Sequence, residues 1–460
     1  MRSLSDAAGR APLAPMPRDP AAALAPYEPS AGHGPWDERH AAHLLRRALG
    51  GPRPGEAEKF GAAGPTAALA RVFAPPDAAR ERLWADAGRS LAGGDRDQLA
   101  AWWLMKLVQD DRAPGARLTL FWHDHFACAQ SKVGDLGFLL RQHETFVSLG
   151  EGAFAPLLNA LAQDPALLRF LDGDSNRRGI PNENLAREIL ELFTLGVGHY
   201  SETDIKEAAR ALTGRTVRNR DYRFIAEHHD PGAKRMFGQD LEDGDGVCRL
   251  AVAQPACARF LAGNFWRYYV SPEPPEPVLD LLAPRWREHD LDAAWIVRTL
   301  CASRAFYSAE AYRSLVKSPV DLVVGTVRAL GAKPNYEACS RACSGMGQQL
   351  FEPPGVQGWA DGEAWIHSAA WIARTNFAAR IAEGAAEFVR GAALDALFPP
   401  ARRGDADTAL ADLAGALLGG DLPAVRAAAL RPSLTAASTP DAAFRTAAHA
   451  VLCLPEYQLS

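Results

Sequence analysis

The chain has 460 residues, of which 48% are apolar and 23% charged, a composition typical of a globular protein with a large buried core. Its formal net charge is −5 at pH 7, with acidic and basic residues interspersed. This balance argues against nucleic acid and anionic membrane surfaces as main partners, because both require a basic face. No window approaches the roughly 18 consecutive apolar residues of a membrane span, so we predict none.

Residues 1–35 are rich in Ala and Pro and predict an extended N-terminal arm. They lack the uninterrupted apolar segment of a signal peptide, which favours a cytoplasmic location. The seven cysteines are odd in number and include no close CxxC pair, so neither a disulfide framework nor a zinc knuckle is expected. Buried thiols in a reducing compartment fit this pattern better.

Apolar residues at helical spacing dominate the rest of the chain. The first predicted helix follows Asp37, a suitable N-cap, and ends at Gly50–Gly51. Further helices are expected over 65–74, 79–91, 96–110, 118–128, 136–149, 246–270, 276–289, 291–302, 310–331 and 338–349. We therefore predict a mainly α fold, with a large multi-helix domain over residues 36–395 and a helical C-terminal lobe over 396–460 packed on it.

One segment departs from the helical pattern. Thr216–Val217 and Tyr222–Phe224–Ile225 flank the polar turn "RNRD", and this arrangement predicts a short β-hairpin near 215–226. The segment "HHDPGAK" at 228–234 follows as a predicted loop.

The segment "LFWHDHFACAQ" at 120–130 carries His123 and His125 among aromatic residues. On an α-helix, residues two apart point about 200° apart, so a regular helix would prevent both imidazoles from binding one metal ion. A strand or a distorted last turn would allow it. The preceding residues fit either a helix or a strand, and both alternatives stay open.

The segment "PNENLAREILELF" at 181–193 places its charged residues on one arc of a helix. One interpretation is a solvated face with a Glu183–Arg187–Glu191 ladder at i, i+4 spacing. The other is that Glu183 and Glu188 face a buried polar cleft. The predicted loop offers a similar choice, because Asp230-Pro-Gly is ordinary turn chemistry, whereas His229 beside Asp230 is a pair that can orient an imidazole as ligand or base.

Taken together, these segments resemble an uncharacterised bacterial family catalogued as domain of unknown function 1800. The resemblance covers residues 43 to about 457. The matching pieces, in family order, are "HLLRRALGGPRPGE", "LFWHDHFA", "RFLDGDSNRRGIPNENLAREILELFTLGVGHYSETDIKEAARALTGRTV", "HHDPGAKRMFG", "LVKSPVDLVVGTVRALG", "FEPPGVQGWADGEAWI" and "LCLPEYQ".

The resemblance implies a mostly helical fold and no settled activity. It implies a genomic companion, a second uncharacterised protein with an alkaline-phosphatase-like fold. Many relatives are exported, whereas this N-terminus shows no export signal. The family pattern includes polar residues at His123, His125, Asn182, Glu183, Asn184, Arg187, Glu188, His229, Asp230 and Lys234. Their occurrence in three separated motifs is what a shared polar site requires.

Two functions follow as hypotheses. The first is a metal-dependent enzyme whose site lies between helices. Its expected ligands to a divalent Fe, Zn or Mn ion are His123, His125, Glu188 and His229. Iron favours oxidative chemistry and zinc favours hydrolysis; the small-molecule or peptide substrate is open. Glu183 or Asp230 would then act as base or support the ligands, while Arg187 and Lys234 would hold an anionic group.

The second hypothesis is a non-catalytic helical scaffold or maturation partner that binds the phosphatase-like companion. The polar residues would then form a structural network. Exposed aromatic residues of "PPGVQGW" at 353–359 would provide the contact surface.

Overall fold

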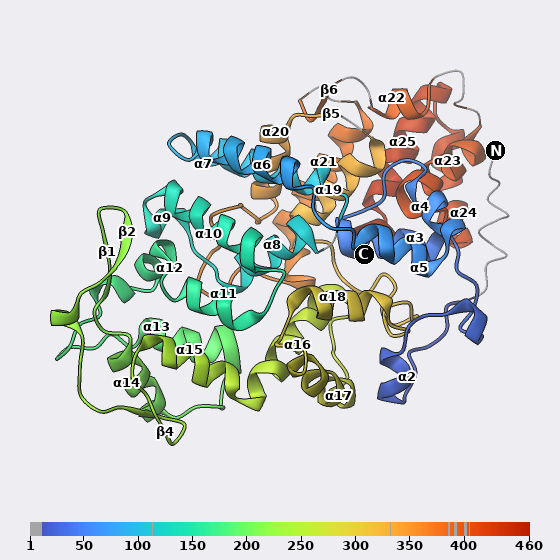
Figure 1. The fold of residues 1–460 in the computed structure, drawn as a ribbon. Coiled ribbons are helices and arrows are strands. Elements are labelled where there is room, and N and C mark those ends of the chain that lie inside the picture. The colour runs from blue at the N-terminus through green and yellow to red at the C-terminus, as the bar shows by residue number, and fades with distance from the viewer. Residues whose placement is uncertain are drawn as a thin grey trace.

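The computed structural model describes residues 12–112, 114–331, 333–384, 387–390, 393–399, 403 and 405–460. The described chain is mainly helical, as predicted, with only two-stranded antiparallel sheets (Figure 1). Its first helices are α2 (Pro20–Leu24), α3 (Glu38–Leu49), α4 (Glu56–Ala63), α5 (Pro65–Val72), α6 (Ala78–Leu91) and α7 (Arg96–Gln109). The described part of the arm, residues 12–35, lies against the body, because Tyr27 N donates to Ala302 O (2.8 Å) and Ala305 N to Ala23 O (2.9 Å).

The central helices carry most of the family motifs. They are α8 (Gly115–His125), α9 (Gln130–Val133), α10 (Leu136–Leu149), α11 (Phe154–Leu161), α12 (Pro165–Phe170), α13 (Asn184–Glu188) and α14 (Glu202–Ala211). A π-helix, η3 (Ile189–Leu195), continues α13 without a break. Short 3₁₀ turns occur at η1 (Pro29–Ala31), η2 (Gly173–Ser175), η4 (Ala226–His228) and η5 (Gly362–Trp365).

The remaining helices are α15 (Gly244–Ala253), α16 (Pro255–Tyr269), α17 (Glu276–Arg287), α18 (Ala293–Ala302), α19 (Pro319–Leu330), α20 (Tyr336–Gly345), α21 (Ser368–Ala382), α22 (Ala393–Leu397), α23 (Ala406–Leu418), α24 (Ala424–Thr435), α25 (Pro440–Cys453) and α26 (Pro455–Gln458). The C-terminal end packs on the main body: Lys317 Nζ donates to Tyr457 O (2.6 Å), and Arg374 Nη1 donates to Gln458 Oε1 (2.9 Å). The boundary at residues 395–396 stays a prediction.

Most predicted helices differ from the observed ones by a few residues at their ends, but two differ more, and proline explains both of these differences. The helix predicted over 246–270 is two helices, because Pro255 has no N–H to continue α15 and begins α16 instead. The helix predicted over 310–331 begins only at Pro319. Ser318 caps it in a reciprocal pair with Asp321, and proline is favoured at the first helical position.

The predicted β-hairpin is confirmed. Strand β1 (Arg215–Arg218) pairs antiparallel with β2 (Asp221–Phe224), with Arg215 opposite Phe224. Asn219 and Arg220 form the turn with φ of 52° and 65°, the left-handed conformation that two-residue hairpin turns require. Two smaller pairs are β3 (Arg235–Met236) with β4 (Gln239–Asp240) and β5 (Lys333–Pro334) with β6 (Val389–Arg390).

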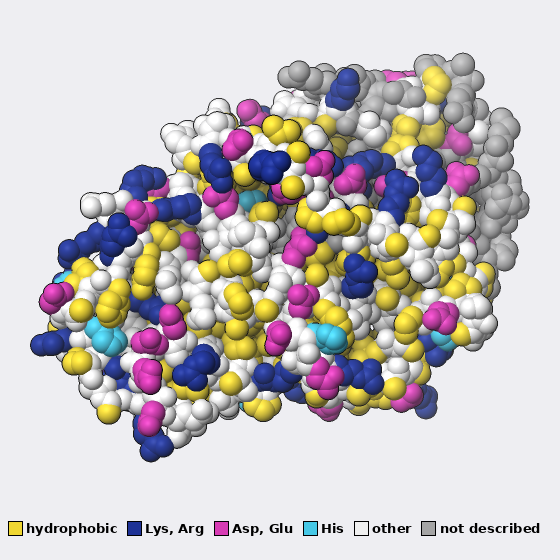
Figure 2. Space-filling model, in the orientation of Figure 1, with side chains coloured by type: hydrophobic (Ala, Val, Ile, Leu, Met, Phe, Trp, Pro, Cys, Tyr) yellow, Lys and Arg dark blue, Asp and Glu magenta, His cyan; other side chains and the backbone are white. Residues whose placement is uncertain are grey.

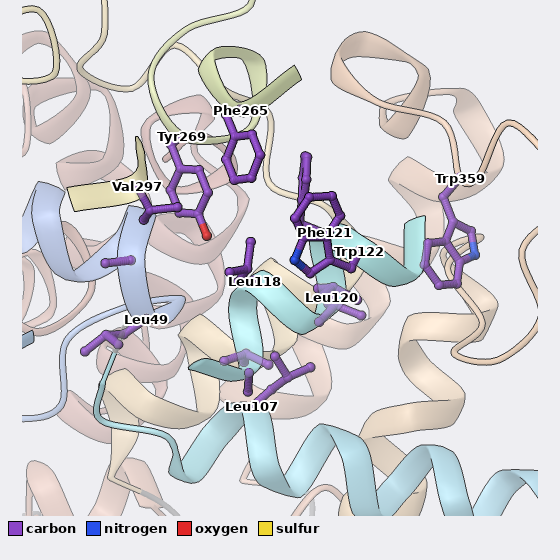
Figure 3. Close-up of a cluster of buried hydrophobic side chains, with 14 of the residues drawn as sticks. Leu49, Leu107, Leu118, Leu120, Phe121, Trp122, Phe265, Tyr269, Val297 and Trp359 are labelled. Atoms are coloured by element: carbon purple, nitrogen blue, oxygen red, sulfur yellow. The ribbon is translucent and has the colours of Figure 1, made fainter. Parts of the chain in front are cut away.

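Helix α8 lies at the centre of the core, and every residue from Ala116 to His123 is buried. Figure 3 shows Phe121 and Trp122 on the side of Phe265, Leu107 of α7 on another side of α8, and Trp359 near its C-terminal end. The ring centroids of Phe121 and Phe265 are 4.5 Å apart. A helix that is buried all round shows no single apolar stripe, which explains why the sequence left its type open.

All seven cysteines are free thiols, and six of them are buried, as predicted. Among the described residues, no helix is both long enough and apolar enough to cross a membrane.

Candidate functional site

His123 and His125 lie in the last turn of α8 and face different surroundings. The His123 ring lies in an aromatic cage, with ring centroids 4.6 Å from Trp103, 5.3 Å from Phe351 and 5.6 Å from Trp359. Within the described residues, neither of its ring nitrogens has a hydrogen-bond partner. Burial lowers the pKa of His123 to about 3, so the imidazole is neutral at physiological pH.

His125 points instead toward the π-helix. Its Nε2 donates to the carbonyl oxygen of Phe193 at 3.1 Å, and its ring stacks on Phe121. Burial lowers the pKa of His125 to about 4, against a smaller opposing effect of this hydrogen bond. The helical alternative for this segment is therefore the observed one, and the two imidazoles do not face a common point.

The π-helix η3 was not predicted by the sequence. It inserts an extra residue into the helical turn, and its end is secured by Thr194 Oγ1, which donates to Ile189 O at 2.6 Å. Gly196 ends it with φ of 77°, and a Cβ there would lie 2.9 Å from the Phe260 ring. Such segments occur often at functional sites, and here η3 links the histidine motif to the glutamate motif through His125.

The predicted ladder along α13 is half right. Arg187 pairs with Glu183 at 3.3 Å, and its second partner is Glu202 of α14 at 3.0 Å. Glu191 bonds the Tyr200 hydroxyl instead, because the helix changes to π geometry at Ile189 and the i, i+4 spacing no longer applies. These charged groups lie at the surface or only partly below it.

Glu188 is half-buried. Its pKa is raised by burial and by the negative charge of Glu191 one turn away. No hydrogen bond or ion pair joins its side chain to another described residue.

The loop residues His229, Asp230 and Lys234 are each held locally. His229 Nδ1 lies 2.9 Å from the carbonyl oxygen of Thr213. Asp230 pairs with Arg210 at 2.7 Å, and this hydrogen bond lowers the pKa of Asp230 to about 2. Lys234 is buried, donates to Gly232 O at 3.0 Å, and has a pKa lowered by burial.

Two further polar residues of the motifs were not in the predicted site. Buried Asn176 donates to Ala209 O and accepts from Asn182 N, both at 2.9 Å. Asn182 Oδ1 in turn accepts from Asn184 N at 2.9 Å. These bonds fix the loop before α13, so two family asparagines have a structural role.

Asp124 is the second polar motif residue that was not in the predicted site, and it joins α8 to the "GVQGW" motif. Its Oδ1 accepts from Trp359 N at 2.7 Å, and a Cβ on Gly358 would collide with the carboxylate. Burial, with a smaller contribution from the charge of Asp361, raises the pKa of Asp124 to about 7. Its place between the two histidines was the available sequence signal, but nothing in the sequence indicated its partner.

The structure divides the predicted site residues into separate local groups. His123 is caged by aromatic rings, His125 caps the π-helix, and His229 lies against Thr213. Across the part of the chain that the structure describes, no group of three or more His, Cys, Asp or Glu side chains is arranged to hold a metal ion. The four predicted ligands are therefore not brought together as one ligand set. Trp359 is buried, so it does not supply the exposed aromatic surface expected of "PPGVQGW".

Comparison with known proteins adds the family and no activity. No curated protein and no solved structure matches the chain significantly. The family model described as "Protein of unknown function (DUF1800)" matches residues 43–459, and the chain therefore belongs to that family.

Proposed function

We propose that this protein is a non-catalytic helical scaffold that binds a partner protein through one exposed face. The carrying observation is a pair of exposed large apolar side chains: Ile180, in the long family motif, is 85% exposed, and Phe224, in the hairpin that follows this motif, is 52% exposed. Arg177, Arg178 and Arg223 are exposed on the same two segments. These five residues are called the binding face below.

Backbone hydrogen bonds join the segment before Ile180 to the residues that flank the hairpin carrying Arg223 and Phe224. Arg178 N donates to His228 O at 2.8 Å, and Gly214 N donates to Asn176 O at 3.0 Å. The motif residues Asn176 and His229 lie behind this face and bond to its loops. These hydrogen bonds support the scaffold hypothesis, in which the polar residues of the family motifs form a structural network beneath an exposed surface.

The chemistry of the binding face suits a protein partner. Aromatic residues and arginine are enriched in protein interfaces, and soluble proteins seldom expose large apolar side chains in groups without a binding role. Figure 2 shows Lys and Arg side chains gathered at the end of the molecule that carries β1 and β2. A partner with an acidic rim around an apolar centre would complement this end.

The partner to test first is the alkaline-phosphatase-like companion that the family resemblance implies. We expect the purified companion from the same genome to bind this chain in a pull-down and in calorimetry. The double variant Ile180→Asp, Phe224→Ser should weaken binding at least about tenfold, because it places a charge and a polar group in the interface. Val425→Asp is the matched control, since Val425 is 73% exposed on α24, and it should bind normally. Failure of the unaltered chain to bind the companion counts against the proposal.

A metal-dependent enzyme of oxidative or hydrolytic type is the second candidate. One observation favours it: burial shifts the pKa of three consecutive residues, His123, Asp124 and His125, and shifted groups cluster at catalytic sites. Metal analysis of protein purified without a nickel column tests it. Substoichiometric iron, zinc and manganese, with melting unchanged by a chelator, would remove this candidate.

The cytoplasmic location also stays a prediction.

A further inference from the structure

A hollow of about 510 Å³ lies between α6, α7 and α10, and no residue of the binding face lines it. Its volume is in the range of small-molecule sites, roughly 300–1,000 Å³. Figure 2 shows basic and acidic side chains gathered along the α6–α7 region above α10. None of the residues named in the proposed function lines this hollow, so the proposed partner binding does not explain its polar residues.

The first polar group of the hollow is Lys106 of α7. Its side chain is only 7% exposed, and within the described chain its ammonium group bonds one partner, Glu81 Oε2 at 2.8 Å. An ammonium group has three N–H donors. A buried cation with spare donors is well placed to receive a second anionic group, because unused donors in a buried position are costly.

The second polar group is His143 of α10. It lines the hollow, is 3% exposed, and neither ring nitrogen has a hydrogen-bond partner among the described residues. Lys106 lines the same hollow. The pKa of His143 is lowered mainly by burial and to a smaller extent by the positive charge of Lys106. A neutral imidazole offers one N–H donor that no described protein group uses.

The lining of the hollow is mixed, and its apolar part is firmly placed. Trp102 lines it, and its indole N–H donates to Trp84 O at 3.2 Å. Ala85 and Val147 complete the apolar lining. Arg89 at the rim pairs with Glu144 at 2.8 Å, so its charge is already compensated. Arg141 also lines the hollow and pairs with Asp221 at 3.1 Å. The unused buried donors of the described lining therefore belong to Lys106 and His143.

We propose that this hollow is a binding site for a small organic anion with a flat apolar body. A carboxylate or similar group accepts hydrogen bonds from Lys106 Nζ and from a ring N–H of His143, while the apolar body lies against Trp102 and Val147. This inference does not depend on the proposed partner function, because it concerns a different surface and different residues.

The probe for this site is benzoate, an aromatic carboxylate, and its uncharged control is benzyl alcohol. Calorimetry on the full chain should show benzoate binding at least about tenfold more tightly than benzyl alcohol, because a hydrogen bond to a charged group adds about 1.5–3 kcal/mol. Equal binding of the two compounds, or no benzoate binding, would overturn the proposal.

Two variants locate the binding. Lys106→Met removes the ammonium group, and His143→Phe removes both ring nitrogens but keeps the aromatic packing on Trp102 and Trp103, whose ring centroids lie 5.1 and 5.0 Å away. Each should weaken benzoate binding about tenfold, while His143→Phe should melt no lower than the unaltered chain. Lys132→Met on α9 is the matched control, since Lys132 is 46% exposed and pairs with Asp172. Unchanged benzoate affinity in His143→Phe, with that variant folded, contradicts the assigned site even if Lys106→Met loses stability.

Discussion

Two regions of this molecule fix their polar motif residues by opposite means. Around α8, His123 is held by aromatic packing, and its ring nitrogens are left without partners in the described structure. In the segment from Asn176 to Asp230, several polar motif residues are held by hydrogen bonds, as Asn176 is by Ala209 and Asn182. A polar residue in a family motif is therefore not by itself evidence of catalysis, since the hydrogen bonds of Asn176 hold a loop in place.

The contrast also separates the two regions by function. The α8 region is buried and connects the core to the "GVQGW" motif through Asp124 and Trp359. The 176–230 region uses its hydrogen bonds to present Ile180 and Phe224 to solvent. We therefore expect mutations in the first region to act on stability. We expect surface mutations in the second region to act on partner binding.

The largest expected effect is the loss of packing around α8. Trp122→Ala should lower the free energy of unfolding by about 3–5 kcal/mol, because Trp122 is fully buried and its indole N–H donates to Gly150 O at 2.8 Å. Urea unfolding followed by circular dichroism measures this. Ile372→Ala on α21 is the control, because Ile372 is exposed and should change little. A loss below about 1 kcal/mol for Trp122→Ala would mean that α8 is not held by packing.

A smaller but still substantial loss is expected for the hydrogen-bonded region. Asn176→Ala removes the partners of Ala209 O and Asn182 N. It should lower the free energy of unfolding by about 2–4 kcal/mol, because each buried group left without a partner costs about 1–3 kcal/mol. The same variant should weaken companion binding, since Asn176 anchors the loop that carries Ile180. If Asn176→Ala binds the companion with unchanged affinity, the position of this loop does not matter for binding through the binding face.

The pH dependence of stability should distinguish the packed histidine from an exposed one. The pKa of His123 is lowered to about 3 in the folded chain from 6.5. The unfolded state therefore binds the proton more readily, and stability falls as pH drops from about 6.5 toward 3. His125, with a pKa of about 4, adds to this loss. Asp124 acts oppositely, because its pKa is raised to about 7: the stability from its protonated form is present at low pH and is lost as pH rises through about 7.

His123→Phe isolates the histidine contribution. The variant should match or exceed the stability of the unaltered chain at about pH 7.5, and its advantage should grow by about pH 4.5, because Phe cannot take up a proton. Urea unfolding at both pH values measures the difference. His199→Gln, at an exposed position, should show no such growth. An advantage of His123→Phe that is independent of pH would contradict the neutral, caged imidazole.

The sequence predicted the class of fold and the hairpin because those depend on local patterns. Asp37 caps the first long helix as its position indicated, and the turn at Asn219–Arg220 lies where polar residues interrupt the strands. The failures arose where local rules compete. Periodicity extended one helix across Pro255, although the proline ends one helix and begins the next.

The candidate site was harder to predict because it depends on contacts between distant segments. The sequence placed His123 and His125 in one motif, but only the fold shows that one faces Trp103 and the other faces Phe193. The contact between Asp124 and Trp359 spans 235 positions, and no single-sequence pattern indicates it. Likewise, the π geometry of η3 moves Glu191 from the expected partner Arg187 to Tyr200, because one extra residue per turn changes which side chains are neighbours.

The smallest expected effect concerns the surface pair in α13 and completes the comparison. Glu183 and Arg187 are both about one-third exposed and lie 3.3 Å apart. Glu183→Gln should therefore lower the free energy of unfolding by no more than about 0.5 kcal/mol, and high salt should remove the difference. Urea unfolding at low and high salt tests this. The enzyme hypothesis gave Glu183 a role as base, and the interpretation behind it places Glu183 in a buried polar cleft. A large loss of stability would support that buried position. A negligible change in stability would leave Glu183 as part of the solvated face that the ladder interpretation predicted.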